Sequence, residues 1–215
     1  MSVQYKALDI TGYRNEPLAN HFFHQEGATA GALVLPGMGY GPRQAGLSYP
    51  IELLTGLGYD VLALESRYGT PEFRNTPDAE ALAWLQADAV GAFQAGNFAD
   101  KQEFCLMGKS IGTIAMTAFL AAQQLPEHSR LVWLTPLLQR EQVRQSIVQY
   151  AALSLVVIGS ADPAYRQEWL DEVAQAGATV TILEGADHGF MVEGDAVSSV
   201  ERLGELVGDV KEFLS

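Results

Sequence analysis

The chain has 215 residues, of which 48% are apolar, so it is long enough for one well-buried core and short for two. Its formal net charge of −13 disfavours general binding to nucleic acid or to an anionic membrane surface, and its single cysteine, Cys105, excludes an internal disulfide and a site of clustered thiolates. No signal-peptide core or membrane-length apolar run is found, so we expect one soluble, cytoplasmic domain over residues 1–215.

Short apolar runs alternate with longer helical patterns along the chain, which is typical of an α/β fold with a mostly parallel sheet covered by helices on both faces. Residues 5–10 and 20–24 are predicted to form a leading antiparallel pair. The strands predicted after them are 32–35, 61–64, 103–107, 131–134, 155–158 and 180–183. Cys105 lies within one of these runs, and we interpret it as core packing.

Helical patterns lie between the predicted strands. Thr76 and Pro77 are predicted to begin one helix, as its N-cap and its first helical residue. Residues 111–122 are apolar nearly all round, which predicts a buried helix. The side chains predicted to face the core are Leu82, Leu85, Ala89 and Phe93 in the helix after Pro77, and Val200, Leu203, Val207, Val210 and Leu214 in the last helix.

Ser110 is the candidate nucleophile, because it lies in Gly108-Lys109-Ser110-Ile111-Gly112 between a predicted strand and the buried helix. A serine on a sharp strand-to-helix turn projects its Oγ away from the sheet, and the crowded turn admits only small residues two before and two after it. Gly108 and Gly112 meet this demand. The alternative is an ordinary helix-starting serine.

A serine hydroxyl needs a base to accept its proton, and His188 is the candidate. His188 follows the predicted strand 180–183 in a loop before the last helix, at the sheet edge where parallel strands end. His21 and His24 come too early in the chain, and His128 lies in a polar turn. Capping of the next helix is the alternative role for His188.

The base in turn needs a carboxylate to orient it, and Asp162 follows the predicted strand 155–158. Asp162-Pro163 is also a typical helix start, and the two roles are compatible. Asp187 is the competing acid, but as the chain neighbour of His188 it is badly placed to meet the imidazole Nδ1 side-on. Chain order and strand-end placement favour Asp162.

The order Ser110, Asp162, His188 and the Gly-x-Ser-x-Gly turn resemble the α/β-hydrolase family over essentially the whole chain, at about the size of dienelactone hydrolases. The resemblance implies an oxyanion hole formed by the backbone N–H of Ile111 and by one from Pro36-Gly37-Met38-Gly39. Met38 is the expected second donor. This loop departs from the His-Gly-Gly-Gly form of many lipases, so Gly37 and Gly39 remain alternatives.

Residues 134–155 leave room for one helix, at 141–151, and not for the cap domain of many relatives. We therefore expect an open site whose mostly apolar wall suits an uncharged acyl group. The expected wall residues are Met38, Tyr40, Ile111, Leu137, Leu138 and Phe190.

Two other features lie near predicted strand ends. Residues 65–69 stand where many relatives carry an Asp-x-Arg-Gly-like turn, and we interpret them as structural. Arg43 follows the oxyanion loop, where it could clamp a substrate carboxylate, although a solvated surface position is favoured.

The sequence thus predicts a serine hydrolase acting on a small carboxylic ester or thioester, with no metal and no organic cofactor. Expected partners are small molecules, not nucleic acid or membrane. Other chemistry on the same fold, such as carbon–carbon hydrolysis or cofactor-free perhydrolysis, stays open because a fold does not fix a reaction. A non-catalytic binding protein is the remaining alternative.

Overall fold

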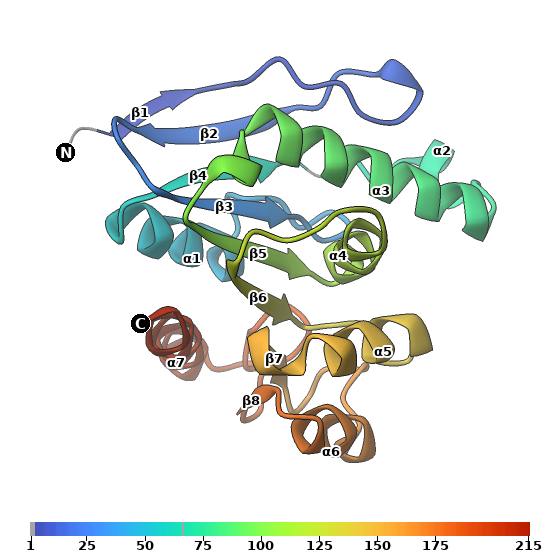
Figure 1. The fold of residues 1–215 in the computed structure, drawn as a ribbon. Helices are drawn as coiled ribbons and strands as arrows, with labels where there is room; N and C mark the ends of the chain where they lie inside the picture. The colour runs from blue at the N-terminus through green and yellow to red at the C-terminus, as the bar shows by residue number, and fades with distance from the viewer. Residues whose placement is uncertain (1–2, 66) are drawn as a thin grey trace.

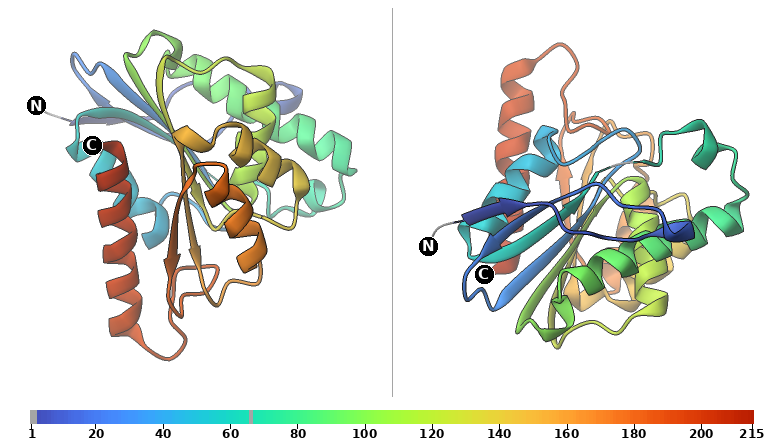
Figure 2. Two further views of the ribbon diagram at one scale, coloured as in Figure 1. Left: turned by 60° about the horizontal axis from the view of Figure 1, so that its bottom comes forward. Right: turned by 90° about the horizontal axis from the view of Figure 1, so that it is seen from above.

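The structure is a computed structural model that describes residues 3–65 and 67–215. Within these residues, eight strands form one sheet that has helices on both faces (Figures 1 and 2). The strands are β1 (Val3–Lys6), β2 (Asn20–Gln25), β3 (Ala30–Leu35), β4 (Tyr59–Leu64), β5 (Glu103–Lys109), β6 (His128–Leu134), β7 (Ser154–Gly159) and β8 (Thr179–Leu183). The helices are α1 (Ala45–Gly56), α2 (Pro71–Arg74), α3 (Asp78–Ala95), α4 (Ile111–Ala122), α5 (Glu141–Gln149), α6 (Gln167–Gln175) and α7 (Ala196–Leu214).

The strand order is β1-β2-β4-β3-β5-β6-β7-β8, and only the pairs that involve β2 are antiparallel. This confirms the predicted mostly parallel sheet with a leading antiparallel pair. The first strand is shorter than predicted and ends at Lys6. Because β3 and β5 to β8 run parallel, their carboxyl ends meet at one edge, where α/β folds place their ligand sites.

Each face of the sheet buries a separate hydrophobic core. Leu33 and Leu62 belong to the core that packs against α2 to α6, whereas their neighbours Ala32 and Val61 belong to the core under α1 and α7. Figure 2 shows α1 and α7 together on one side of the sheet. Cys105 lies in this second core with no exposed surface, which confirms its role in packing.

The predicted absence of a cap domain agrees with the short connection from β6 to β7. It holds α5 and one short 3-10 turn, Ala151–Leu153. The connection from β4 to β5 is more extended: α2 and the first turns of α3 project past the carboxyl edge of the sheet (Figure 1). No helix in the described part of the chain is long and apolar enough to cross a membrane.

Helix α3 begins one residue later than predicted, with Pro77 as its N-cap. The helix start that uses a threonine cap and a proline lies earlier, at Thr70 and Pro71, where the Thr70 hydroxyl accepts a hydrogen bond from the Phe73 amide at 3.3 Å. On α3, Leu85 is buried as predicted, but Leu82 is 36% exposed.

Helix α7 also differs from its predicted inward stripe. Leu203 and Val210 are buried as predicted, but Val200 is 69% exposed and Leu206 is fully buried. The physical reason is Ser199, which is 1% exposed and whose hydroxyl accepts a hydrogen bond from the Val192 amide at 2.9 Å. Since residues are about 100° apart on a helix, the inward position of Ser199 turns Val200 to solvent.

Candidate active site

Ser110 occupies a sharp turn between β5 and α4. Its backbone has φ 54° and ψ −118°, a conformation that costs a non-glycine residue energy and is typical of functional sites. A Cβ on Gly108 would lie 2.6 Å from the carbonyl oxygen of Gly112, and a Cβ on Gly112 would lie 2.5 Å from that of Leu35. The two glycines are therefore required by close backbone approach, as the sequence pattern predicts.

The structure brings Ser110, His188 and Asp162 together in one chain of hydrogen bonds. The Ser110 Oγ lies 2.8 Å from His188 Nε2, and His188 Nδ1 lies 2.7 Å from Asp162 Oδ2. An imidazole protonated at Nδ1 satisfies both contacts, because it donates to the carboxylate and accepts from the serine hydroxyl. The Asp162 side chain is fully buried, whereas that of His188 is 38% exposed. This geometry can activate a serine.

Asp162 lies in a turn after β7 and does not cap a helix. Its Oδ1 accepts a hydrogen bond from the Ala164 amide at 2.8 Å, while α6 begins only at Gln167. This local bond leaves Oδ2 for His188. The helix start predicted at Asp162-Pro163 is therefore wrong, and these two residues form a backbone turn instead.

His188 lies in the loop between β8 and α7, whose N-cap is Asp195. Asp187 is adjacent in the chain but turns away from the imidazole. Its Oδ1 accepts hydrogen bonds from the amides of Gly189 at 2.7 Å and Met191 at 2.9 Å. The Asp187 carboxylate therefore fixes the shape of the loop.

The other histidines have partners elsewhere. His21 pairs with Glu65 at 2.6 Å, and His24 with Asp60 at 3.1 Å, while His128 begins β6. In the predicted structural turn 65–69, Ser66 lies outside the described residues. Its neighbours form ion pairs with other segments: Glu65 with His21, and Arg67 with Glu16 at 2.6 Å.

The loop after β3 makes a tight turn against Ser110. Gly37 and Tyr40 exchange backbone hydrogen bonds at 2.9 and 3.3 Å, and a Cβ on Gly37 would lie 3.6 Å from the Cβ of Ser110. Within the described residues, the amides of Met38 and Ile111 have no hydrogen-bond acceptor. Two N–H groups beside the nucleophile turn are thus available to a ligand oxygen, as an oxyanion hole requires.

Lys109 is a further polar residue of this site that the sequence analysis did not single out. It is 1% exposed, and its Nζ donates hydrogen bonds to the Thr135 hydroxyl at 2.9 Å and to the His188 carbonyl at 2.6 Å. The available signal was a lysine at the end of an apolar strand, directly before Ser110.

The expected wall residues divide into two groups. Met38 and Ile111 line a cavity, and Tyr40 and Leu137 are half-buried beside the turn. Leu138 and Phe190 differ from the expectation: both have no exposed surface and belong to the two cores, so they do not face a ligand in this conformation.

The cavity that Met38 and Ile111 line has a volume of about 590 Å³ and lies between α2, α3, α4 and the start of α5. Its other apolar lining includes Phe73, Leu82, Leu85 and Ile114. Charged side chains also border it: Arg140 lies 3.7 Å from the exposed Asp78, and Arg74 has no ion-pair partner among the described residues.

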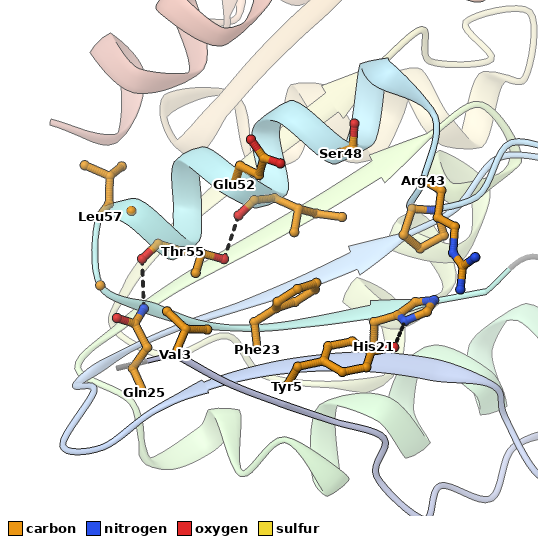
Figure 3. A pocket seen from close by; sticks show the side chains of 14 residues that line it. Val3, Tyr5, His21, Phe23, Gln25, Arg43, Ser48, Glu52, Thr55 and Leu57 are labelled. Carbon is orange, nitrogen blue, oxygen red and sulfur yellow. Dashed lines mark hydrogen bonds between the residues drawn. The ribbon is translucent and has the colours of Figure 1, made fainter. Parts of the chain in front are cut away.

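A larger cavity of about 840 Å³ lies between α1 and the β1–β2 pair (Figure 3). Arg43 lines this cavity, with its side chain 84% exposed and its Nε 4.0 Å from Glu65. Ser110, His188 and Asp162 line neither cavity, but the smaller one is lined by Ile111, which directly follows Ser110 in the chain. Arg43 therefore belongs to a different cavity from the one next to Ile111.

No group of three or more histidine, cysteine, aspartate and glutamate side chains in the described ranges is arranged to hold a metal ion.

No protein-family model matches the sequence, and no curated protein matches it. Solved structures do match over nearly the whole chain. A dienelactone hydrolase from Anabaena variabilis is 17% identical with a TM-score of 0.73, covering 99% of this chain and 97% of its own. An esterase from Pyrococcus furiosus is 17% identical with a TM-score of 0.67, and the match covers 99% of this chain and 92% of the esterase. A serine hydrolase without a lid from Xanthomonas campestris is 17% identical with a TM-score of 0.68, covering 99% and 94%.

Proposed function

We propose that this chain, which has the compact α/β-hydrolase fold without a cap domain, is a serine hydrolase acting on a carboxylic ester or thioester of a small acyl group. The observation that carries the proposal is the hydrogen-bonded chain from Ser110 through His188 to the buried Asp162. Binding alone does not require a serine held in a strained turn against an imidazole that a carboxylate orients.

In the first half of the reaction, the Ser110 Oγ attacks the acyl carbonyl carbon while His188 Nε2 accepts the hydroxyl proton. The developing oxyanion is stabilised by the amides of Ile111 and Met38, which have no acceptor among the described residues. Asp162 stabilises the imidazolium that forms. His188 then returns the proton to the leaving alcohol or thiol, and an acyl group remains on Ser110.

In the second half, a water molecule takes the place of the leaving group. His188 accepts a proton from this water, whose oxygen attacks the acyl carbon through the same oxyanion site. Collapse of the intermediate releases the carboxylic acid and returns the proton to Ser110. The chain's own residues complete this cycle without a cofactor.

The cavity beside Met38 and Ile111 supports the substrate part of the proposal. Its volume of about 590 Å³ lies within the range of small-molecule sites, which is about 300–1,000 Å³. Leu82 and Met38, which are 36% and 42% exposed, would be covered by an apolar group bound there. We place the acyl group in this cavity and expect it to be small and uncharged.

The test is labelling with a fluorophosphonate probe, combined with a hydrolysis screen over p-nitrophenyl and coenzyme A esters. Wild-type protein should label and hydrolyse at least one ester class, Ser110→Ala should do neither, and Ser48→Ala, which changes a serine of the other cavity, should do both. Labelling without hydrolysis of any ester would favour other chemistry, such as carbon–carbon hydrolysis or perhydrolysis. Absence of labelling in the folded wild type would favour a binding protein.

A further inference from the structure

The buried side chain of Lys109 connects three segments that surround the proposed catalytic centre. Its ammonium donates to the Thr135 hydroxyl after β6 at 2.9 Å and to the His188 backbone carbonyl at 2.6 Å. It also lies 4.4 Å from the ring centroid of Tyr40, which closes the oxyanion turn, and 4.9 Å from that of Phe190, in the His188 loop.

Burying a cation in this environment costs free energy. No carboxylate lies within 4.0 Å of the Lys109 ammonium in the described part of the chain, and the partners that it contacts are neutral. The charged groups that act on it at longer range are Asp162 and Asp187, which favour its protonated form, but burial outweighs them and lowers the pKa of Lys109 to about 8. Tyr40 is kept neutral, since burial raises the pKa of its phenol.

A packing role does not explain a lysine here. A leucine or methionine would fill the same volume without the desolvation cost of an ammonium. What only the cation supplies is a charge-assisted hydrogen bond to the main chain of His188, which is about twice as strong as a neutral one.

We propose that Lys109 is a positioning residue for His188: its ammonium fixes the His188 backbone so that the imidazole reaches both Ser110 and Asp162. This inference rests on the proposed hydrolase function. It assigns a role to the variable position before the serine in the Gly-x-Ser-x-Gly turn.

A positioning role acts on the chemical step more than on binding of the substrate. Lys109→Met should therefore lower kcat and kcat/KM together, while KM changes little.

The experiment measures kcat and KM for p-nitrophenyl acetate at pH 7, alongside the rate of fluorophosphonate labelling. For Lys109→Met we expect at least a tenfold loss in kcat with little change in KM, together with slower labelling. The matched control is Lys101→Met: Lys101 donates to the Ala28 carbonyl at 2.7 Å and pairs with Asp60 at the opposite end of β5. Its loss should leave kcat and KM unchanged.

Thr135→Val tests the same hydrogen-bonded contact with the cation retained, and it remains informative if Lys109→Met fails to fold. It removes one acceptor of the ammonium, so kcat should fall about threefold or more with little change in KM. With an active wild type, an unchanged kcat in folded Lys109→Met or full activity in Thr135→Val would overturn the role of Lys109 alone. A wild type that neither labels nor hydrolyses would overturn the proposed function as well.

Discussion

Asp162 reaches the imidazole of His188 from a different strand end, and its Oδ2 lies 2.7 Å from Nδ1. The Oδ1 of the same carboxylate accepts a hydrogen bond from the Ala164 amide. One oxygen of Asp162 therefore binds the local turn and the other binds the distant histidine. Asp187, the chain neighbour of His188, instead accepts hydrogen bonds from two amides of its own loop. Because Asp162 is distant from His188 in the chain, its carboxylate can approach the imidazole from the side, which Asp187, as the chain neighbour of His188, does not do.

Asp162→Asn is expected to lower kcat by about 10⁴-fold, since an amide neither stabilises the imidazolium nor fixes its tautomer. Asparagine retains an oxygen for the Ala164 amide, so the melting temperature should change little. Asp187→Asn should cost much less in kcat. Steady-state hydrolysis and thermal melts of both variants give the comparison, and a greater loss in kcat/KM for Asp187→Asn would reverse the assignment of the acid.

Ser110→Ala should abolish turnover, because loss of the nucleophile in such a unit typically costs about a million-fold in kcat. The glycines around the turn are unchanged, so the circular dichroism spectrum should match that of the wild type. A residual rate above about a hundredth of wild type would identify another residue as the nucleophile.

Acyl length should raise kcat/KM only until the cavity of about 590 Å³ is filled. Each buried methylene contributes about 0.8 kcal/mol, whereas one left in water contributes nothing. Leu82→Trp, which places a bulkier side chain in the cavity, should shorten the acyl length at which kcat/KM is highest. The measurement is kcat/KM for acetyl to palmitoyl p-nitrophenyl esters below their micelle concentrations. A steady rise to palmitoyl would contradict an acyl site of this volume and would indicate a longer acyl channel.

Arginine substitutions should distinguish the two cavities. Arg74 lines the cavity next to Ile111 and has no ion-pair partner among the described residues. Arg74→Gln removes this cation, so it should lower the kcat/KM ratio of carboxylate-bearing to neutral acyl esters. Arg43→Gln removes an equal charge from the other cavity and should leave this ratio unchanged. A ratio that changes with Arg43 but not with Arg74 would restore the carboxylate-clamp role considered for Arg43 from the sequence.

Stability should respond to pH through Lys109. Its pKa is lowered in the folded state from 10.5 to about 8, so between these values the unfolded chain binds more protons and the free energy of unfolding rises with pH. The rise that Lys109 contributes is up to about 3 kcal/mol. Urea titrations at pH 7.5 and 10 should show it as a difference between the wild type and Lys109→Met. Parallel pH dependences of the two proteins would contradict it.

The sheet and the Ser110 turn were predictable from the sequence because both have local causes. Buried parallel strands are continuously apolar, and the turn requires glycine at positions 108 and 112. The residues at strand ends then converge because parallel strands end at one edge. The Gly-x-Ser-x-Gly pattern, placement at strand ends and chain order together therefore predicted the three residues that the structure joins by hydrogen bonds.

The remaining details depend on tertiary contacts that leave no local signal. Leu138 and Phe190 are as apolar as a pocket wall, and only the packed structure shows that they belong to the cores. Val200 is displaced from the core by the hydrogen bond of Ser199. The cavity wall that α2 and α3 form near Met38 and Ile111 was not predicted, because the expectation of an open site rested on the short segment 134–155 alone.

The position of Cys105 allows the solvent exposure of the central sheet to be measured spectroscopically. It is the only thiol of the chain, it lies in the middle of β5 with no exposed surface, and burial raises its pKa to about 12. A thiolate is needed for reaction with a disulfide reagent, so the folded protein should resist modification at neutral pH. The rate at which Ellman's reagent consumes this thiol then reports how often β5, the strand that ends directly before Ser110, becomes exposed to solvent.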